Sequence, residues 1–138
     1  MDWGVAQLWS KDAKEMFVRI NAMIDRYRPA LIVAEDVPFN GRRMRGWCRM
    51  KSLQDLGKRR GVPVECVTRA AVKRAFASVA TTKQEVAVVL AEEFPELETI
   101  LPRPRKPWMA EDRQMNVFDA LAFMIAASRR DQPAAATA

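Results

Sequence analysis

Hydrophobic residues recur at helical spacing in several stretches of the chain and run without a break in one short stretch. Between residues 12 and 27 the apolar positions fall three or four residues apart, which predicts a helix with one face toward the core. Pro29 should end this helix. Residues 31–34 (LIVA) form a continuous apolar run, typical of a strand that is covered on both faces. A helix followed by such a strand favours α/β layering. The apolar positions of the helix are Met16, Ile20, Met23, Ile24 and Tyr27.

Two further strands and a helix follow from the same pattern. Residues 3–9 (WGVAQLW) predict a weak strand, and residues 63–67 predict a second short one. Thr68 can cap a helix that runs through Phe76. The chain therefore alternates between short strands and helices.

The C-terminal half contains helix signals and one proline-rich loop. In the stretch TKQE, the Thr82 hydroxyl can accept from the Glu85 amide while the Glu85 carboxylate reaches back, so a helix should run to about Phe94. Residues 101–108 (LPRPRKPW) predict a basic loop. The last helix should span roughly residues 111–130.

Basic residues are concentrated between residues 40 and 61, after the turn-forming pair Asn40-Gly41. A single acid, Asp55, lies among them. We expect this segment to form the basic face of the molecule. Its cations are Arg42, Arg43, Arg45, Arg49, Lys51, Lys58, Arg59 and Arg60.

The composition bounds the class of protein. With 138 residues, 49% of them hydrophobic, the chain can bury one core, so we expect a single domain over residues 1–130 and a flexible tail over 131–138. No apolar run approaches a membrane span, and no signal peptide is recognisable. Two cysteines without histidine fit neither a disulfide framework nor a zinc site, and a cytoplasmic location is the simplest setting. The net charge of +6 favours a polyanionic partner.

Two carboxylates follow the apolar run directly. Glu35 and Asp36 lie at the C-terminal end of the predicted strand, where α/β proteins usually assemble their sites. The alternative is structural: either acid could cap the next turn or pair with a nearby arginine. The location alone does not decide between the two.

Polar residues also share one face of the last predicted helix. Asp112, Asn116 and Asp119 are four and three residues apart, and the helix is almost wholly apolar after Asp119. A partly buried acid at Asp119 would need a cation or a hydrogen-bond partner. Asp112 better fits a solvated acid at the helix N-terminus. Lys83, at the start of a capped helix, could deliver its ammonium to a phosphate or to an acidic metal site.

Oxygen ligands without His or Cys indicate Mg²⁺ or Mn²⁺ rather than zinc. Acids surrounded by basic segments suggest metal-assisted chemistry on a phosphodiester, in which metal ions activate a water and stabilise the leaving oxygen. The arginines would hold the nucleic-acid backbone outside the site.

Four stretches resemble the RuvC-like Holliday junction resolvases, a family with the RNase H-like fold. RPALIVAED is similar to the family strand in which a proline precedes the catalytic glutamate by six residues, here Pro29 and Glu35. PVECVTRAAVK resembles the strand and helix start that lead to a Val-Lys pair, here Val72-Lys73.

The other two stretches resemble later parts of the family pattern. TTKQEV is similar to the helix start that carries the second lysine, here Lys83. NVFDALAFMIAA resembles the closing helix with the final metal ligand, here Asp119. The four stretches agree in order and approximate spacing over residues 29–127. The resemblance implies an α/β, RNase H-like fold of the RuvC type: a mixed sheet flanked by helices, shortened at its N-terminus.

The resemblance also implies roles for these residues. Glu35 and Asp119 would be metal ligands, and Asn116, where relatives carry an acid or histidine, could ligate through its carbonyl or hold a water. Lys73 and Lys83 would contact the scissile phosphate or stabilise developing charge. The basic helix over residues 42–60 would meet the arms of branched DNA. Its apolar positions Trp47, Met50 and Leu53 could meet a second subunit, since resolvases of this kind cut four-way junctions as two-fold homodimers.

The chain departs from the family pattern at its start. The family's first catalytic Asp lies in Asp-x-Gly on an opening strand; Asp2-Trp3-Gly4 imitates this tripeptide without the preceding apolar residues. Residues 3–9 better match the family's third strand, so we expect the first hairpin to be missing, through truncation, a late start codon or the choice of expressed boundaries. Such a chain could bind DNA yet cleave poorly or not at all. The family's glycines between the two lysines are also absent, replaced by AFASVATT.

Three functional hypotheses remain. The first is a metal-dependent endonuclease of branched DNA. The second is a non-catalytic DNA-binding module on the same fold. The third is a basic α/β scaffold that binds protein.

Overall fold

The structure is a computed structural model that describes residues 2, 4, 5 and 13–131. The chain forms two compact units. The strand unit comprises residues 6–68 and contains the two described strands, and the helical unit comprises residues 1–5 and 69–138. The expectation of a single domain over residues 1–130 stays a prediction.

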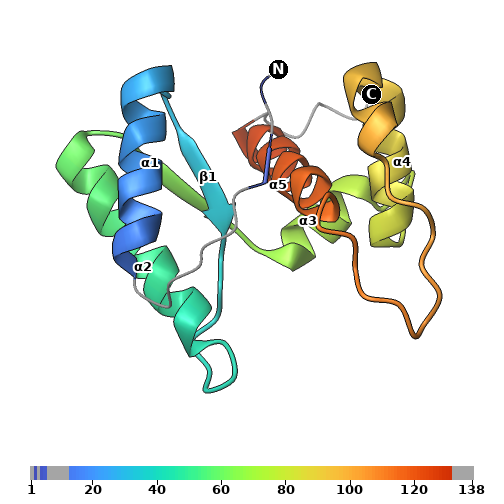
Figure 1. Cartoon of the computed structure of the whole chain (residues 1–138), viewed down its shortest axis with the longest axis horizontal. Coiled ribbons are helices and arrows are strands. Elements are labelled where there is room, and N and C mark those ends of the chain that lie inside the picture. Colours follow the sequence, from blue (N-terminus) through green and yellow to red (C-terminus); the bar gives the residue numbers. More distant parts are fainter. Residues whose placement is uncertain (1, 3, 6–12, 132–138) are drawn as a thin grey trace. The chain divides into compact units, whose positions relative to one another are not determined.

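The strand unit combines a small parallel sheet with two helices (Figure 1). The strands pair with Glu35 opposite Val67, and the N–H of Asp36 donates to the Val67 carbonyl at 2.8 Å. Because the strands are parallel, their C-terminal ends meet at one edge of the sheet, and Glu35 lies at this edge. Its elements are α1 (Ala13–Tyr27), β1 (Ile32–Glu35), α2 (Met44–Arg60) and β2 (Val64–Val67).

Two glycines determine how α2 ends and packs on β2. A methyl group at Gly57 would lie 2.5 Å from Cγ2 of Val64 and 2.6 Å from the carbonyl oxygen of Val62, so this close approach needs glycine. Gly61 has a φ of +69°, and the next amide, that of Val62, donates to the Gly57 carbonyl at 2.9 Å. This left-handed cap ends the helix and turns the chain into β2.

The helical unit packs its helices around an apolar core. Helix α4 and helix α5 contact each other, α3 contacts α5, and the short 3₁₀-helix η1 contacts α4. The largest fully buried side chains of this unit are Phe76, Phe118, Leu90 and Leu97. Its elements are α3 (Arg69–Phe76), α4 (Lys83–Glu93), η1 (Pro95–Ile100) and α5 (Met115–Asp131).

The predicted capping box at the start of α4 is confirmed. The Thr82 hydroxyl accepts from the Glu85 amide at 3.2 Å, and the Glu85 carboxylate accepts from the N–H of Thr81 at 2.8 Å and its hydroxyl at 3.1 Å. These hydrogen bonds favour the charged carboxylate and lower the pKa of Glu85, the bond from the Thr81 amide having the largest effect. The first turn of α4 is therefore firmly held.

Several predicted boundaries and faces differ from the structure. Helix α5 begins at Met115 and not near residue 111, because the carboxylate and carbonyl of Asp112 accept from the amides of Gln114 and Met115 and form a turn first. In α1, Ile24 is buried, whereas Met23 is exposed although we expected it to face the core.

The strands also depart from expectation. In the described part of the chain the side chains of β1 are only partly buried, whereas the apolar run predicted cover on both faces. The predicted strand over residues 3–9 and the tail after residue 131 lie largely outside the described residues. Across residues 13–131, no helix is long and apolar enough to cross a bilayer.

Candidate active site in the helical unit

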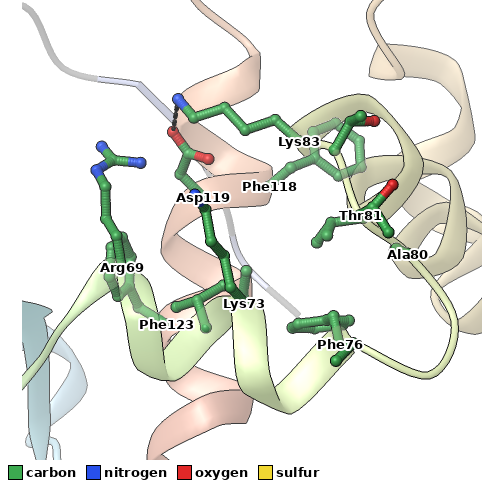
Figure 2. A pocket seen from close by; sticks show the side chains of 14 residues that line it. Arg69, Lys73, Phe76, Ala80, Thr81, Lys83, Phe118, Asp119 and Phe123 are labelled. Carbon is green, nitrogen blue, oxygen red and sulfur yellow. Dashed lines mark hydrogen bonds and ion pairs between the residues drawn. The ribbon is translucent and has the colours of Figure 1, made fainter.

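A cavity of about 690 Å³ opens between α3, the start of α4 and α5. Its walls are mostly apolar, with Phe76, Phe118 and Phe123 among them, and its charged lining consists of three cations and one acid. Figure 2 shows the side chains of Lys83 and Arg69 extending toward the end of the pocket that holds Asp119, while Phe76 lies at the opposite end. Charge is thus concentrated at one end of the pocket.

Asp119 is the acid of this site. It lies on α5, its side chain is 22% exposed, and its Oδ2 lies 3.2 Å from Nζ of Lys83. Partial burial was expected for this residue from the apolar sequence that follows it, together with either a cation or a hydrogen-bond partner, and the structure shows the cation. Its role as a metal ligand stays a prediction.

Lys83 connects two carboxylates. It is the first residue of α4, and its Nζ lies 3.2 Å from Oε1 of Glu111 as well as 3.2 Å from Oδ2 of Asp119. Because the capping box holds the first turn of α4, the base of the Lys83 side chain is fixed where the ammonium can reach both acids. The ammonium thus lies between two carboxylates, and its predicted delivery to a phosphate or to an acidic metal site stays a prediction.

Lys73 and Asn116 lie on neighbouring helices. Lys73 is exposed on α3 and lines the cavity. Asn116 is exposed in the first turn of α5, three residues before Asp119. Helical geometry places residues three apart on the same side of a helix, so Asn116 and Asp119 share a face. Roles for Lys73 at a phosphate and for Asn116 at a metal stay predictions.

Two site residues were not identified from the sequence. Arg69 lines the cavity from the first position of α3, with its guanidinium carbon 5.8 Å from the centre of the Phe123 ring. Glu111 belongs to the loop before α5 and contacts Lys83. Neither lies in a motif: Arg69 follows a capping threonine, and Glu111 is one of two adjacent acids in a loop. No local signal distinguishes them from ordinary surface charges.

Glu35 belongs to the strand unit, at the end of β1. Its Oε1 accepts from Nη2 of Arg43 at 3.0 Å, and its side chain is 22% exposed. This is the ion pair with a nearby arginine that the sequence left open as a structural alternative. The expected meeting of Glu35 with Asp119 at one metal stays a prediction.

The predicted basic face occupies α2 and the turn before it. Arg43 pairs with Glu35, and Arg60 pairs with Asp25 and also donates to Oδ1 of Asn21 at 3.0 Å. Arg49 is partly buried. The other predicted cations are exposed, and their contact with DNA stays a prediction: Arg42, Arg45, Lys51, Lys58 and Arg59.

The apolar positions of α2 do not all face outward. Met50 is buried in the strand unit, and its sulfur accepts from the Val37 N–H at 3.3 Å. Its suggested place in a subunit interface is therefore wrong, because its side chain packs within its own unit. Trp47 is partly buried and packs edge-on against the exposed ring of Phe39, with 4.8 Å between the two ring centroids.

The donor set can be compared with what a divalent metal needs. Glu111 and Asp119 each place a carboxylate oxygen 3.2 Å from one shared cation, the Lys83 ammonium. Within residues 13–131 and the described start of the chain, no group of three or more His, Cys, Asp or Glu is placed to hold a metal ion. These oxygen donors fit Mg²⁺ or Mn²⁺ in kind, since Mg²⁺ is commonly held by one or two carboxylates, with water and phosphate completing its shell.

Comparisons with known proteins identify the fold. No protein-family model and no curated protein sequence matches the chain. Among solved structures, the chain is similar to T. thermophilus RuvC in complex with a Holliday junction substrate, with a TM-score of 0.59 and 22% sequence identity. The similarity covers 85% of this chain and 67% of that chain. The protein therefore has a RuvC-like fold. The two-stranded parallel sheet seen among the described residues is compatible with an RNase H-like architecture, and the mixed sheet expected from the sequence stays a prediction.

Proposed function

We propose that this protein is a structure-selective endonuclease that hydrolyses phosphodiester bonds in branched DNA, such as four-way junctions, with Mg²⁺ or Mn²⁺. The observation that carries the proposal is the contact of Lys83 with Asp119 at the charged end of a cavity in a protein with a RuvC-like fold. At such a place the carboxylate can bind a metal cation while the neighbouring ammonium binds a phosphate of the substrate.

Three cations of the cavity would bind the DNA backbone. Arg69, Lys73 and Lys83 come from two different helices and line one cavity, so a phosphate there would meet positive charge from more than one side. Lys83 would also stabilise the negative charge that develops on the phosphoryl oxygens. The exposed cations of α2 would contact DNA further along its backbone.

Asp119 would hold the metal, together with Glu35 and with Asn116 through its carbonyl oxygen. A bound Mg²⁺ supplies a nucleophilic water and neutralises charge on the reacting phosphate. Lys83, which contacts Asp119 and Glu111, would present its ammonium to the phosphate bound in the cavity. Two copies of the chain would act on the two equivalent strands of a four-way junction.

Nicking of a labelled four-way junction tests the proposal. We expect strand cleavage that needs Mg²⁺ or Mn²⁺ and is lost in Glu35→Gln and in Asp119→Asn. Glu92→Gln, which changes an exposed acid on α4 outside the cavity, is the matched control and should cleave normally. Cleavage that survives both site substitutions would reject these residues as the catalytic acids.

A non-catalytic DNA-binding module is the second candidate. It is favoured by the described part of the chain, which contains no cluster of three metal-ligating side chains, and by the ion pairs that Glu35 and Asp119 make with cations of the protein. Calorimetric titration with Mn²⁺ separates the two candidates. An endonuclease should bind the ion through Asp119, whereas the module should bind junction DNA with or without it.

A further inference from the structure

The loop before α5 presents an aromatic side chain to solvent among positive charges. Trp108 is 78% exposed, the highest exposure among the large hydrophobic side chains of the described residues. Lys106 lies over its ring, with Nζ 5.3 Å from the centroid. The loop is orange in Figure 1 and projects away from the helices of its unit. Between residues 99 and 110 the chain carries Arg103, Arg105 and Lys106 and no acid.

Both ends of this loop are tied to neighbouring residues of α4. At one end Nε2 of Gln84 donates to the carbonyl of Pro102, which is buried, at 2.7 Å. At the other end Nζ of Lys83 contacts both carboxylate oxygens of Glu111, at 3.2 and 3.4 Å. Residues 102–111 therefore form a closed loop rooted on the first turn of one helix.

The tip of the loop is held as well. The guanidinium of Arg105 donates to the Met109 carbonyl at 3.0 Å, and the Met109 N–H donates to the Lys106 carbonyl at 2.9 Å. Prolines at 102, 104 and 107 restrict the backbone further. A loop held in this way loses little conformational entropy when it binds a ligand. The loop therefore holds Trp108 in an exposed position before any ligand binds.

We propose that residues 102–111 form a stacking surface for an unpaired base of the DNA substrate. An exposed indole offers a face on which any base can stack, and the neighbouring cations suit the phosphates on either side of that base. A base inside a duplex has no free face, whereas single-stranded stretches and branch points expose one. The one acid in the sequence of residues 102–111, Glu111, lies at the root of the loop and contacts Lys83, so the remaining charges of the surface are positive and favour a polyanion.

The same lysine links this surface to the candidate active site. Lys83 contacts Glu111 at the root of the loop and Asp119 in the cavity. A strand held at Trp108 would therefore be bound by a loop whose root shares Lys83 with the cavity. This inference rests on the proposed function and specifies which feature of the DNA the protein would recognise.

Binding of three labelled DNAs tests the inference: a 20-nucleotide oligo-dT, a blunt duplex and a four-way junction. We expect Trp108→Ala to weaken oligo-dT binding about fivefold or more and duplex binding less than twofold, because stacking on an aromatic side chain contributes about 1–3 kcal/mol per base. Trp108→Phe should keep most of the affinity. Val79→Ala removes an exposed apolar side chain of the same unit outside this loop and should change nothing.

Tryptophan emission gives a second readout that does not depend on affinity. The difference in emission between wild type and Trp108→Phe reports on Trp108 alone. Addition of oligo-dT should quench this difference. Circular dichroism checks that the variants keep their helices. If Trp108→Ala binds oligo-dT like wild type, or loses duplex and single strand equally, the stacking surface is rejected while the nuclease proposal stands. If wild type binds none of the three DNAs, the proposed function itself fails.

Discussion

The ammonium of Lys83 lies 3.2 Å from Oδ2 of Asp119, although the two residues are 36 positions apart in the chain. Their side chains are 44% and 22% exposed, so the ion pair contributes only about 0–1 kcal/mol to stability. Such a pair can open at low cost when a metal ion or a phosphate arrives. The contact therefore contributes little to holding the fold.

Replacing Lys83 by Met should separate metal binding from cleavage. Without the ammonium, Asp119 would bind Mn²⁺ more tightly, by up to about fivefold if the lost pair contributes 1 kcal/mol. Nicking of a four-way junction should nevertheless fall, because the phosphate loses a cation. Calorimetric titration and a nicking assay measure the two effects. Lys14→Met, on α1, is the control. If Lys83→Met lowered both the Mn²⁺ affinity and the nicking rate, the proposal that the Lys83 ammonium and the metal compete for Asp119 would be contradicted.

Replacing Glu111 by Gln should change DNA affinity and cleavage in opposite directions. The substitution removes a negative charge near the proposed DNA path, so binding should stay equal or become tighter. Nicking should slow, because Lys83 loses the carboxylate that helps to position it. Glu111→Asp should restore part of the rate. Glu98→Gln, in η1, should leave the rate unchanged, and an equal effect of both substitutions would indicate general charge and not position.

Replacing Gly57 by Ala should destabilise the protein. The added methyl group would lie 2.5 Å from Cγ2 of Val64 and 2.6 Å from the backbone oxygen of Val62, which cannot move without shifting the chain. Overpacking of this kind costs about 1–3 kcal/mol, more than the roughly 1 kcal/mol that alanine contributes as a helix former. Urea unfolding measures the difference. Gly41→Ala, with no atom within 4 Å of the new methyl, should be nearly neutral.

Replacing Glu85 by Gln should alter the pH dependence of stability. The hydrogen bonds from Thr81 hold the pKa of Glu85 below its ordinary value of 4.5, so the folded state favours the carboxylate. Its contribution is present above pH 4.5 and is lost as the pH falls through the lowered pKa. Wild type should therefore melt at a higher temperature than Glu85→Gln at pH 7, and the gap should close below pH 4.5. A gap that stays constant to pH 2 would contradict this assignment.

The two cysteines should react at different rates with iodoacetamide. Cys48 is exposed, whereas burial raises the pKa of the Cys66 thiol despite a hydrogen bond from Gln54 at 3.4 Å. Less Cys66 is therefore present as the reactive thiolate at pH 8. Mass spectrometry over time should show modification of Cys48 first. In Cys48→Ser, labelling should be slow until the protein is unfolded.

Patterns formed by residues close together in the chain were sufficient to predict most of the helices and strands of this protein. The Thr82–Glu85 capping box, the stop at Pro29 and the apolar periodicity placed α1, α3 and α4 within a residue or two of their observed bounds. These features depend on hydrogen bonds and backbone preferences within one or two turns. The start of α5 was missed, because the turn made by Asp112 competes with the helix there.

The contacts of the candidate site depend instead on packing between distant segments. Sequence patterns marked Lys83 and Asp119 separately, but nothing local indicated that Glu111, 28 residues after Lys83, would contact the same ammonium. The outward position of Trp108 and the burial of Met50 are likewise set by which neighbours surround each side chain. The sequence around an apolar or charged residue is the same whether its side chain is buried or exposed in the folded protein. The helices and strands were thus predictable from neighbouring residues. The contacts of the site side chains were not, because they form only when folding brings distant segments of the chain together.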